Sequence, residues 1–417
     1  MKYNKANNLT PVKVKDRILA LDVIRGFALL GILFVNILDF SGIQFLKQRD
    51  PSIDQSALYE VVEIFFRGKF ICLFSILFGI GFAMQISKFI KFGGFKRFYI
   101  RRMVVLFLFG LLHLILDPLE VLNIYAVCGV LLLFIRKIPH NIILVIALVI
   151  MALPYLQLTM SSLRDSTLSL EQNDSFISEQ LKNSAPFDYE VSEIGWNLYT
   201  SDIAAAMYSK KNFLEIMTFN MDYALMRRTS SWINWLWFMA VLPYMLIGFI
   251  LAKLKLFENQ ETYRSVFKTV VLIGLGFGIL CPWINDFLIT KVYTNGWSPW
   301  FSFIGALIST VSIVMTALAY GSGIMLLLQI SFWRNVLSPL KYYSRMALTN
   351  YILQTIICIG LFYHFGFDLF GKLKLGSVIF MAVGIHLVLG AISSIWLKKN
   401  RYGPLEGLWR YLTYWNI

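Results

Sequence analysis

Two charged side chains lie inside the first apolar stretch of the chain. Asp22 and Arg25 occur in the motif LDVIRG, and the apolar run continues beyond them. Residues i and i+3 share a face of a helix, so the two side chains could form an ion pair. Ionisable groups in hydrocarbon are costly and usually functional, so Arg25 could instead bind an anion. A guanidinium group suits this task because it binds phosphate or carboxylate through two hydrogen bonds.

A polar residue follows an arginine by eleven positions at two places. Asn36 follows Arg25, and His113 follows Arg102. Eleven residues make about three helical turns, so each pair shares a helix face and spans about 16 Å along the axis. Interhelical hydrogen bonding would explain Asn36 and His113 equally well. His113 could alternatively accept a proton in catalysis, because histidine titrates near neutral pH.

Further polar groups lie in the carboxyl-terminal part of the chain. Arg345 opens an apolar run that contains Asn350 and Gln354, in the motif SRMALTNY. The two amides could join helices or line a pocket. The tail motif GPLEGLWR predicts a turn and a short interfacial helix that anchors the chain to the membrane surface. A cytoplasmic ring of arginines would suit a phosphorylated ligand or anionic lipid. Its predicted members are Arg25, Arg102, Arg345 and Arg410.

The composition indicates a helical membrane protein. Of the 417 residues, 58% are hydrophobic and 15% are charged, whereas a soluble domain carries about 25% charged residues. Apolar runs of about 20 residues recur along the chain, and each is long enough to cross a bilayer as a helix. The sequence therefore predicts an all-α, polytopic membrane protein with about ten transmembrane helices. The predicted spans are 18–40, 58–87, 103–119, 120–136, 141–160, 232–254, 269–290, 298–328, 346–368 and 376–397.

The distribution of basic residues predicts the orientation of these spans. Clusters of Lys and Arg occur before the first span, in alternate loops and in the tail. The positive-inside rule makes the side on which they lie cytoplasmic, so both termini are expected there. The net charge of +14 follows from this topology. We therefore expect membrane lipids as partners and no nucleic acid.

The spans divide the chain into three parts. Residues 1–160 form an amino-terminal half with five spans and the LDxxRG motif, and residues 232–417 form a second half with five spans and the SRMALTNY and GPLE motifs. Residues 161–231 are predicted to be an extracytoplasmic segment. The four cysteines lie in apolar segments without metal-ligand spacing, so neither a disulfide nor a metal site is expected.

Together these motifs resemble the YeiB-like family of bacterial membrane proteins, whose carboxyl-terminal half is domain of unknown function 418. The resemblance implies a multi-pass protein of the bacterial cell membrane. The family usually shows Gly-Asp-Ile-Leu before a Tyr-Ala pair, whereas this chain has Leu-Glu-Val-Leu there, so Glu120 supplies the carboxylate. The matching pieces are LDxxRG through Asn36, residues 68–81, Arg101 to His113, Tyr125-Ala126, SRMALTNY with Gln354, and GPLE with Trp409-Arg410 and Thr413-Tyr414.

The first-span motif is also similar to that of wider transmembrane acyltransferases, including the acyltransferase-3 and heparan-glucosaminide acetyltransferase groups. That similarity implies a ten-helix core that moves acyl groups from cytoplasmic acyl-CoA to an acceptor sugar. In acyltransferase-3 proteins a histidine stands where this chain has Asn36. Asparagine cannot act as a general base, so His113 would have to replace that histidine.

Three functions fit these residues. The first is a membrane acyltransferase that uses a donor such as acyl-CoA to modify a cell-envelope glycan, a lipid or another small molecule, with His113 as its base. The second is a transporter of an amphiphilic anion, and the third is a non-catalytic envelope scaffold. Formation of a homo-oligomer is left open. The predicted substrate-binding residues are Asp22, Arg25, Asn36, Arg102, Glu120, Arg345, Asn350 and Gln354.

Overall fold

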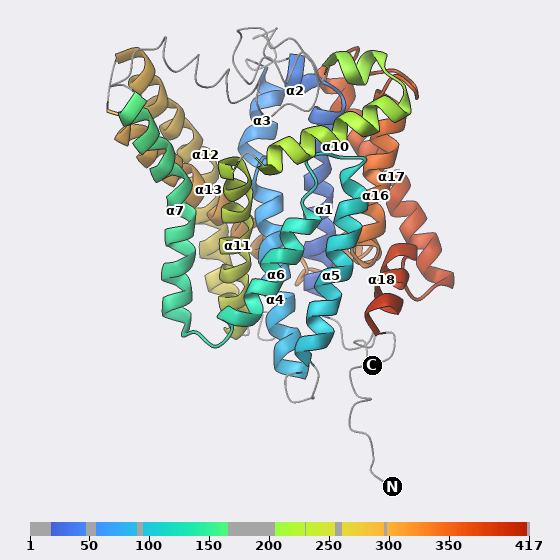
Figure 1. The fold of residues 1–417 in the computed structure, drawn as a ribbon. Coiled ribbons are helices and arrows are strands. Elements are labelled where there is room, and N and C mark those ends of the chain that lie inside the picture. Colours follow the sequence, from blue (N-terminus) through green and yellow to red (C-terminus); the bar gives the residue numbers. More distant parts are fainter. Residues whose placement is uncertain are drawn as a thin grey trace.

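The computed structural model is a bundle of helices (Figure 1). It describes residues 18–46, 56–89, 95–165, 205–229, 231–254, 261–295 and 298–414, and every regular element within them is helical. The predicted all-α fold is confirmed. The helices are α1 (Leu19–Phe40), α2 (Ile43–Leu46), α3 (Ala57–Phe65), α4 (Lys69–Phe89), α5 (Phe95–Leu114), α6 (Leu122–Ile135), α7 (His140–Asp165), α10 (Phe213–Thr229), α11 (Ser231–Lys253), α12 (Arg264–Asn295), α13 (Trp300–Leu327), α14 (Ser331–Leu337), α15 (Leu340–Arg345), α16 (Ala347–Phe362), α17 (Leu375–Lys399) and α18 (Pro404–Tyr414).

Six helical stretches of the described chain are long and apolar enough to cross a membrane. A seventh results if α14–α15 and α16, which meet at 83°, count as one span. This number is lower than the ten spans predicted from the sequence, because α5, α6 and α11 are not counted among them. The described part of α11 counts only as a shorter apolar helix, Ala240–Lys253. The first eight residues of α5 include four basic ones. Helix α6 has 14 residues and is about 21 Å long, which is shorter than a hydrocarbon core of about 30 Å.

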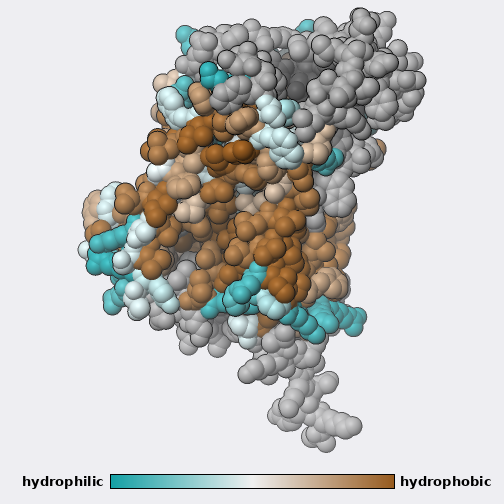
Figure 2. All heavy atoms as spheres, turned by 90° about the vertical axis from the view of Figure 1, so that its left-hand side faces the viewer, coloured by the Kyte–Doolittle hydropathy of each residue, from teal (hydrophilic) through white to brown (hydrophobic). Residues whose placement is uncertain are grey.

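The outer surface of the bundle is apolar, as a lipid-facing surface requires. Exposed apolar side chains cover α7, α12 and α17, among them Val145, Leu272 and Phe380. Figure 2 shows one such face, where a broad apolar area ends at hydrophilic side chains along its lower edge. These features are typical of a multi-pass membrane protein.

Glycines bring some helices into close contact inside the bundle. A Cβ atom at Gly79 of α4 would overlap the backbone of Met245 in α11, and one at Gly248 would overlap Ile76. Small residues allow such close approach between membrane helices. Helices α4 and α11 therefore form a tightly packed pair that supports one side of the functional region.

Two helix breaks place polar residues inside the bundle. Gly68 has a φ of 77° and separates α3 from α4, next to Arg67 and Lys69. Met346 separates α15 from α16. Irregular backbone at membrane depth is tolerated where it lines a cavity or is buried in protein. Both breaks meet this condition, because Gly68 lines the central cavity and Met346 is buried.

Helix α10 lies crosswise at the end of the bundle opposite α18 (Figure 1). Asn220 fixes it there, because its side-chain amide donates hydrogen bonds to the carbonyls of Ile115 and Leu116, both at 3.1 Å. The hydroxyl of Tyr208 donates to Asn220 Oδ1 at 2.8 Å. Residues 205–229 of the predicted extracytoplasmic segment thus cover the turn after α5. Residues 166–204 of that segment lie outside the described residues.

Candidate functional site

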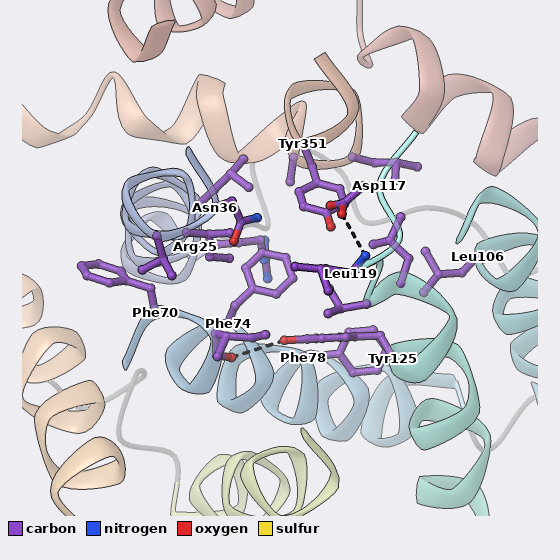
Figure 3. A pocket seen from close by; sticks show the side chains of 18 of the residues that line it. Arg25, Asn36, Phe70, Phe74, Phe78, Leu106, Asp117, Leu119, Tyr125 and Tyr351 are labelled. Carbon is purple, nitrogen blue, oxygen red and sulfur yellow. Dashed lines mark hydrogen bonds between the residues drawn. The ribbon is translucent and has the colours of Figure 1, made fainter. Parts of the chain in front are cut away.

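A cavity of about 830 Å³ lies in the middle of the bundle. Side chains from α1, α4, α5, α6, α15, α16 and α18 line it, together with residues of the turn between α5 and α6. Figure 3 shows a group of these side chains converging from several helices. Among the described residues, no group of three or more His, Cys, Asp or Glu could hold a metal ion.

All four arginines of the predicted ring line this cavity. They come from four different helices, so it is the packing of these helices that brings the four side chains to the same cavity. They are Arg25 of α1, Arg102 of α5, Arg345 of α15 and Arg410 of α18. Such a set can bind several anionic oxygens at once, because each guanidinium presents a planar fork of donors.

Arg25 forms the predicted ion pair with Asp22 and also lines the cavity. Its Nη1 donates to Asp22 Oδ1 at 3.1 Å, so the ion pair exists. The Arg25 side chain nevertheless lines the cavity, whereas Asp22 does not. Asp22 therefore orients the Arg25 side chain from a position outside the cavity lining.

Arg102 is held by the carboxyl-terminal helix α18. Its guanidinium lies 4.2 Å from the ring centroid of Trp409, and Trp409 Nε1 donates to the backbone oxygen of Arg102 at 3.1 Å. Arg410 stacks in the same way on Tyr402, also at 4.2 Å. A planar guanidinium on an aromatic face keeps its edge free to donate hydrogen bonds.

Glu406 of the GPLE motif attaches α18 to the start of α16. Its carboxylate accepts hydrogen bonds from the Thr349 backbone N–H at 3.0 Å and from Thr349 Oγ1 at 2.6 Å. Glu406, Trp409 and Arg410 all line the cavity. The tail therefore forms part of the cavity wall, in addition to any contact with the membrane surface.

Burial raises the pKa of the Glu406 carboxyl above its ordinary value, and the Thr349 hydrogen bonds offset only part of this. The folded protein therefore holds this proton more tightly than the unfolded chain. We expect the stability contributed by Glu406 to be greatest near pH 4 and to fall as pH rises through the folded pKa. The melting temperature of the wild type, minus that of Glu406→Gln, should decrease between about pH 4 and pH 7.

Glu215→Gln provides a control of opposite sign. Hydrogen bonds from Asn212 and Lys211 lower the pKa of Glu215, which lies on the exposed surface of α10. The stability contributed by Glu215 is present above its unfolded pKa and is lost as pH falls. The melting temperature of the wild type, minus that of Glu215→Gln, should therefore increase with pH. Equal slopes for the two variants would contradict our description of Glu406.

The middle of the cavity is largely apolar and aromatic. Asn36 supplies an amide there, and Figure 3 shows it facing Phe74 and Tyr125 across the cavity. Tyr125 is held in place by a 2.6 Å hydrogen bond between its hydroxyl and Ser75 Oγ. Arg25 and Asn36 thus line one continuous cavity, as their spacing suggests.

His113 and Glu120 lie beside the cavity, outside its lining. His113 Nδ1 is paired with Glu120 Oε2, and His113 Nε2 is 2.9 Å from Thr355 Oγ1. Both side chains are fully buried. The His113 ring packs against Tyr351, with 4.9 Å between ring centroids, and Tyr351 does line the cavity. A base role for His113 would require the ring to leave one of these partners.

Asn350 and Gln354 also point away from the cavity. Asn350 Nδ2 donates to the Tyr343 carbonyl at 3.1 Å and to Ser393 Oγ at 2.9 Å. Gln354 Nε2 donates to the Tyr343 hydroxyl at 2.7 Å. These bonds connect α15, α16 and α17, so the helix-joining alternative describes both amides in this structure. Sequence reasoning gave no functional role to Asp117, Tyr351 or Trp409, all of which line the cavity.

Comparison with known proteins shows which family the chain resembles. Residues 251–416 match the family model "Protein of unknown function (DUF418)". The Escherichia coli (strain K12) protein "Uncharacterized protein YeiB" is 27% identical over 421 residues, which cover 95% of this chain and 96% of that protein. These two matches support the assignment of the chain to the YeiB-like DUF418 family.

Two other relatives also align with this YeiB-like protein over nearly the whole length of both chains. "Uncharacterized protein YxaH" of Bacillus subtilis (strain 168) is 28% identical, covering 98% of this chain and 97% of its own. "Uncharacterized 39.9 kDa protein in amylase 3'region" of Bacillus acidopullulyticus is 28% identical, covering 97% and 96%. No solved structure gives a significant match. The DUF418 region contributes Arg345 and Arg410 to the cavity, while Arg25 and Arg102 precede it.

Proposed function

We propose that this protein is an acyltransferase of the bacterial cell membrane. It would take an acyl group from a cytoplasmic donor such as acyl-CoA and transfer it to a cell-envelope glycan or lipid. One observation supports this most: the same cavity is lined by four arginines and by many aromatic and apolar side chains. The proposal includes ten membrane crossings with both termini in the cytoplasm, so that the shorter α6 and the charged α5 also cross.

The arginines would bind the phosphate groups of the donor. Hydrogen bonds between charged partners are the strongest available to a protein, and guanidinium matches phosphate geometry. By the positive-inside rule, this end of the cavity would face the cytoplasm, where acyl-CoA is found. The acyl thioester would then extend past Asn36 towards the end covered by α10.

The proposed reaction joins the acyl group to an acceptor hydroxyl. The hydroxyl oxygen attacks the thioester carbonyl, a new C–O bond forms and the C–S bond breaks. The hydroxyl proton ends on the thiolate that leaves, so one thiol is released for each ester formed. The Asn36 amide N–H could stabilise the negative charge that develops on the carbonyl oxygen.

Transport of an amphiphilic anion is the second candidate, and the position of His113 favours it. A transporter needs no general base, and His113 has partners at both ring nitrogens outside the cavity lining. The same arginines would then form an entry site, and the ligand would leave unchanged at the end covered by α10.

One experiment separates the two candidates. Purified protein in liposomes would receive acyl-CoA labelled in the acyl group, together with a bacterial envelope fraction as acceptor. Acyl transfer predicts thiol release and label in a glycan or lipid. Transport predicts that intact acyl-CoA accumulates in preloaded vesicles without thiol release. The absence of both results, with empty liposomes as control, would contradict both candidates.

A further inference from the structure

Asp117 lies close to His113 in the chain, and its carboxylate reaches the cavity, whereas the His113 side chain does not. Asp117 lines the cavity, and only 6% of the residue is exposed. It lies in the turn between α5 and α6. In Figure 3 its carboxylate lies beside Tyr351, on the wall across from Arg25 and Asn36. A carboxylate in this place faces the part of the cavity where a donor bound by the arginines would carry its thioester.

The local backbone holds the Asp117 carboxylate in one orientation. Its Oδ1 accepts a 2.9 Å hydrogen bond from the backbone N–H of Leu119. The Asp117 N–H donates to the His113 carbonyl at 2.9 Å, and the Glu120 N–H donates to the Asp117 carbonyl at 3.2 Å. The side chains of His113 and Glu120 pair across the same turn. The buried pair thus fixes both ends of the turn that presents Asp117.

We propose that Asp117 is the group that accepts the proton of the acceptor hydroxyl, and that the His113–Glu120 pair positions it. This inference rests on the proposed acyltransferase function. As the hydroxyl oxygen forms its bond to the acyl carbon, Asp117 takes the hydroxyl proton. As the C–S bond breaks, the same proton passes from Asp117 to the sulfur, so the enzyme returns to its starting state and a thiol leaves.

Other carboxylates of the cavity are less suited to this role. Glu406 accepts two hydrogen bonds from Thr349 at the arginine end. Asp39 lies one helical turn beyond Asn36 on α1 and within electrostatic range of Arg67. Asp39 therefore has a charged neighbour of its own in Arg67. Asp117 combines a place in the lining with an orientation that the backbone fixes.

The test measures two properties of Asp117→Asn in liposomes, with palmitoyl-CoA as the donor and the bacterial envelope fraction as the acceptor. We expect thiol release to fall at least about 100-fold, the lower part of the range for loss of a general base. Binding of palmitoyl-CoA, followed by equilibrium dialysis, should stay within about threefold because the arginines are intact. Asp222→Asn, on α10 and outside the cavity lining, is the matched control and should retain wild-type rates.

The possible results separate this inference from the proposed function. Wild-type rates in Asp117→Asn, or a larger loss in Asp39→Asn, would overturn the role of Asp117 and leave the acyltransferase function intact. Failure of the wild-type protein to release any thiol would overturn the function and the inference with it. Unchanged binding with a large loss of thiol release in Asp117→Asn alone would support both.

The positioning pair has its own readout. Titratable groups within electrostatic range of Asp117 include His113, Glu120, Tyr208, Tyr351, Cys358 and Tyr363. Only histidine and glutamate ordinarily titrate below about pH 8. Glu120→Gln should therefore shift the pH profile of thiol release, and Glu120→Asp should restore it. A lower yield of folded protein with an unchanged pH profile would show that the pair is structural only.

Discussion

Arg102→Ala is expected to weaken the binding of acyl-CoA about 10- to 100-fold. Arg102 lines the cavity and stacks on Trp409, which leaves the edge of its guanidinium available for phosphate. A hydrogen bond to a charged group contributes about 1.5–3 kcal/mol, which corresponds to this change in affinity. The affinity of Arg102→Lys for acyl-CoA should lie between those of the wild type and Arg102→Ala, because lysine keeps the charge but lacks the planar fork. Equilibrium dialysis with labelled acyl-CoA measures all three proteins.

The control removes a similar charge elsewhere. Arg264 begins α12 and is exposed, outside the cavity lining. Arg264→Ala should bind acyl-CoA like the wild type. If both arginine variants lose affinity equally, binding reflects the overall positive charge of this end of the protein. If neither loses affinity, the cavity does not bind the donor phosphates. Weaker binding at high salt is expected for the wild type in any case, since salt screens partly exposed charges.

The sequence predicted the fold class and the arginines well, for physical reasons. Long apolar runs can only be satisfied by helices in lipid, so the all-α bundle follows from composition. Arginines at the ends of apolar segments are expected at a membrane interface, and the positive-inside rule predicts the same interface for these four. The sequence therefore predicted that the four arginines lie at the same end of the bundle. All four line the cavity, namely Arg25, Arg102, Arg345 and Arg410.

Helical spacing alone could not predict which residues reach the cavity. The eleven-residue rule holds for Arg25 and Asn36, which both line it. The rule does not extend to His113, because α5 lines the cavity only as far as Leu106 and its last turn packs against α16. The partner of His113, Thr355, is 242 positions away in the chain. A single sequence contains no signal for such a long-range contact.

The role of the tail illustrates the same limit. A short helix with one apolar face suits a membrane surface and a protein surface equally well. Its actual place depends on Glu406 meeting Thr349, 57 positions earlier, and on Trp409 meeting Arg102. Both contacts depend on how α5 and α16 pack, which hydropathy does not determine. Asp117 escaped notice for a similar reason, since a turn carboxylate beside a proline is common at any protein surface.

His113→Ala is expected to lower the free energy of unfolding by about 3–5 kcal/mol, the range measured when one partner of a buried ion pair is removed. His113 and Glu120 are fully buried and bonded to each other, and Thr355 completes the network. Removing the imidazole would leave the Glu120 carboxylate with the Leu122 N–H as its remaining hydrogen-bond donor in this network. The loss can be measured by denaturant unfolding of the protein in detergent micelles.

A double variant shows whether this loss comes from a buried charge without its partner. His113→Leu combined with Glu120→Leu removes both polar groups, and an apolar replacement of a buried pair is often neutral or stabilising. The double variant should therefore be more stable than His113→Ala. If His113 were instead the catalytic base, His113→Ala would abolish thiol release while the protein kept its wild-type stability. A stable and fully active His113→Ala protein would contradict both roles, since neither the turn that presents Asp117 nor the reaction would then depend on this imidazole.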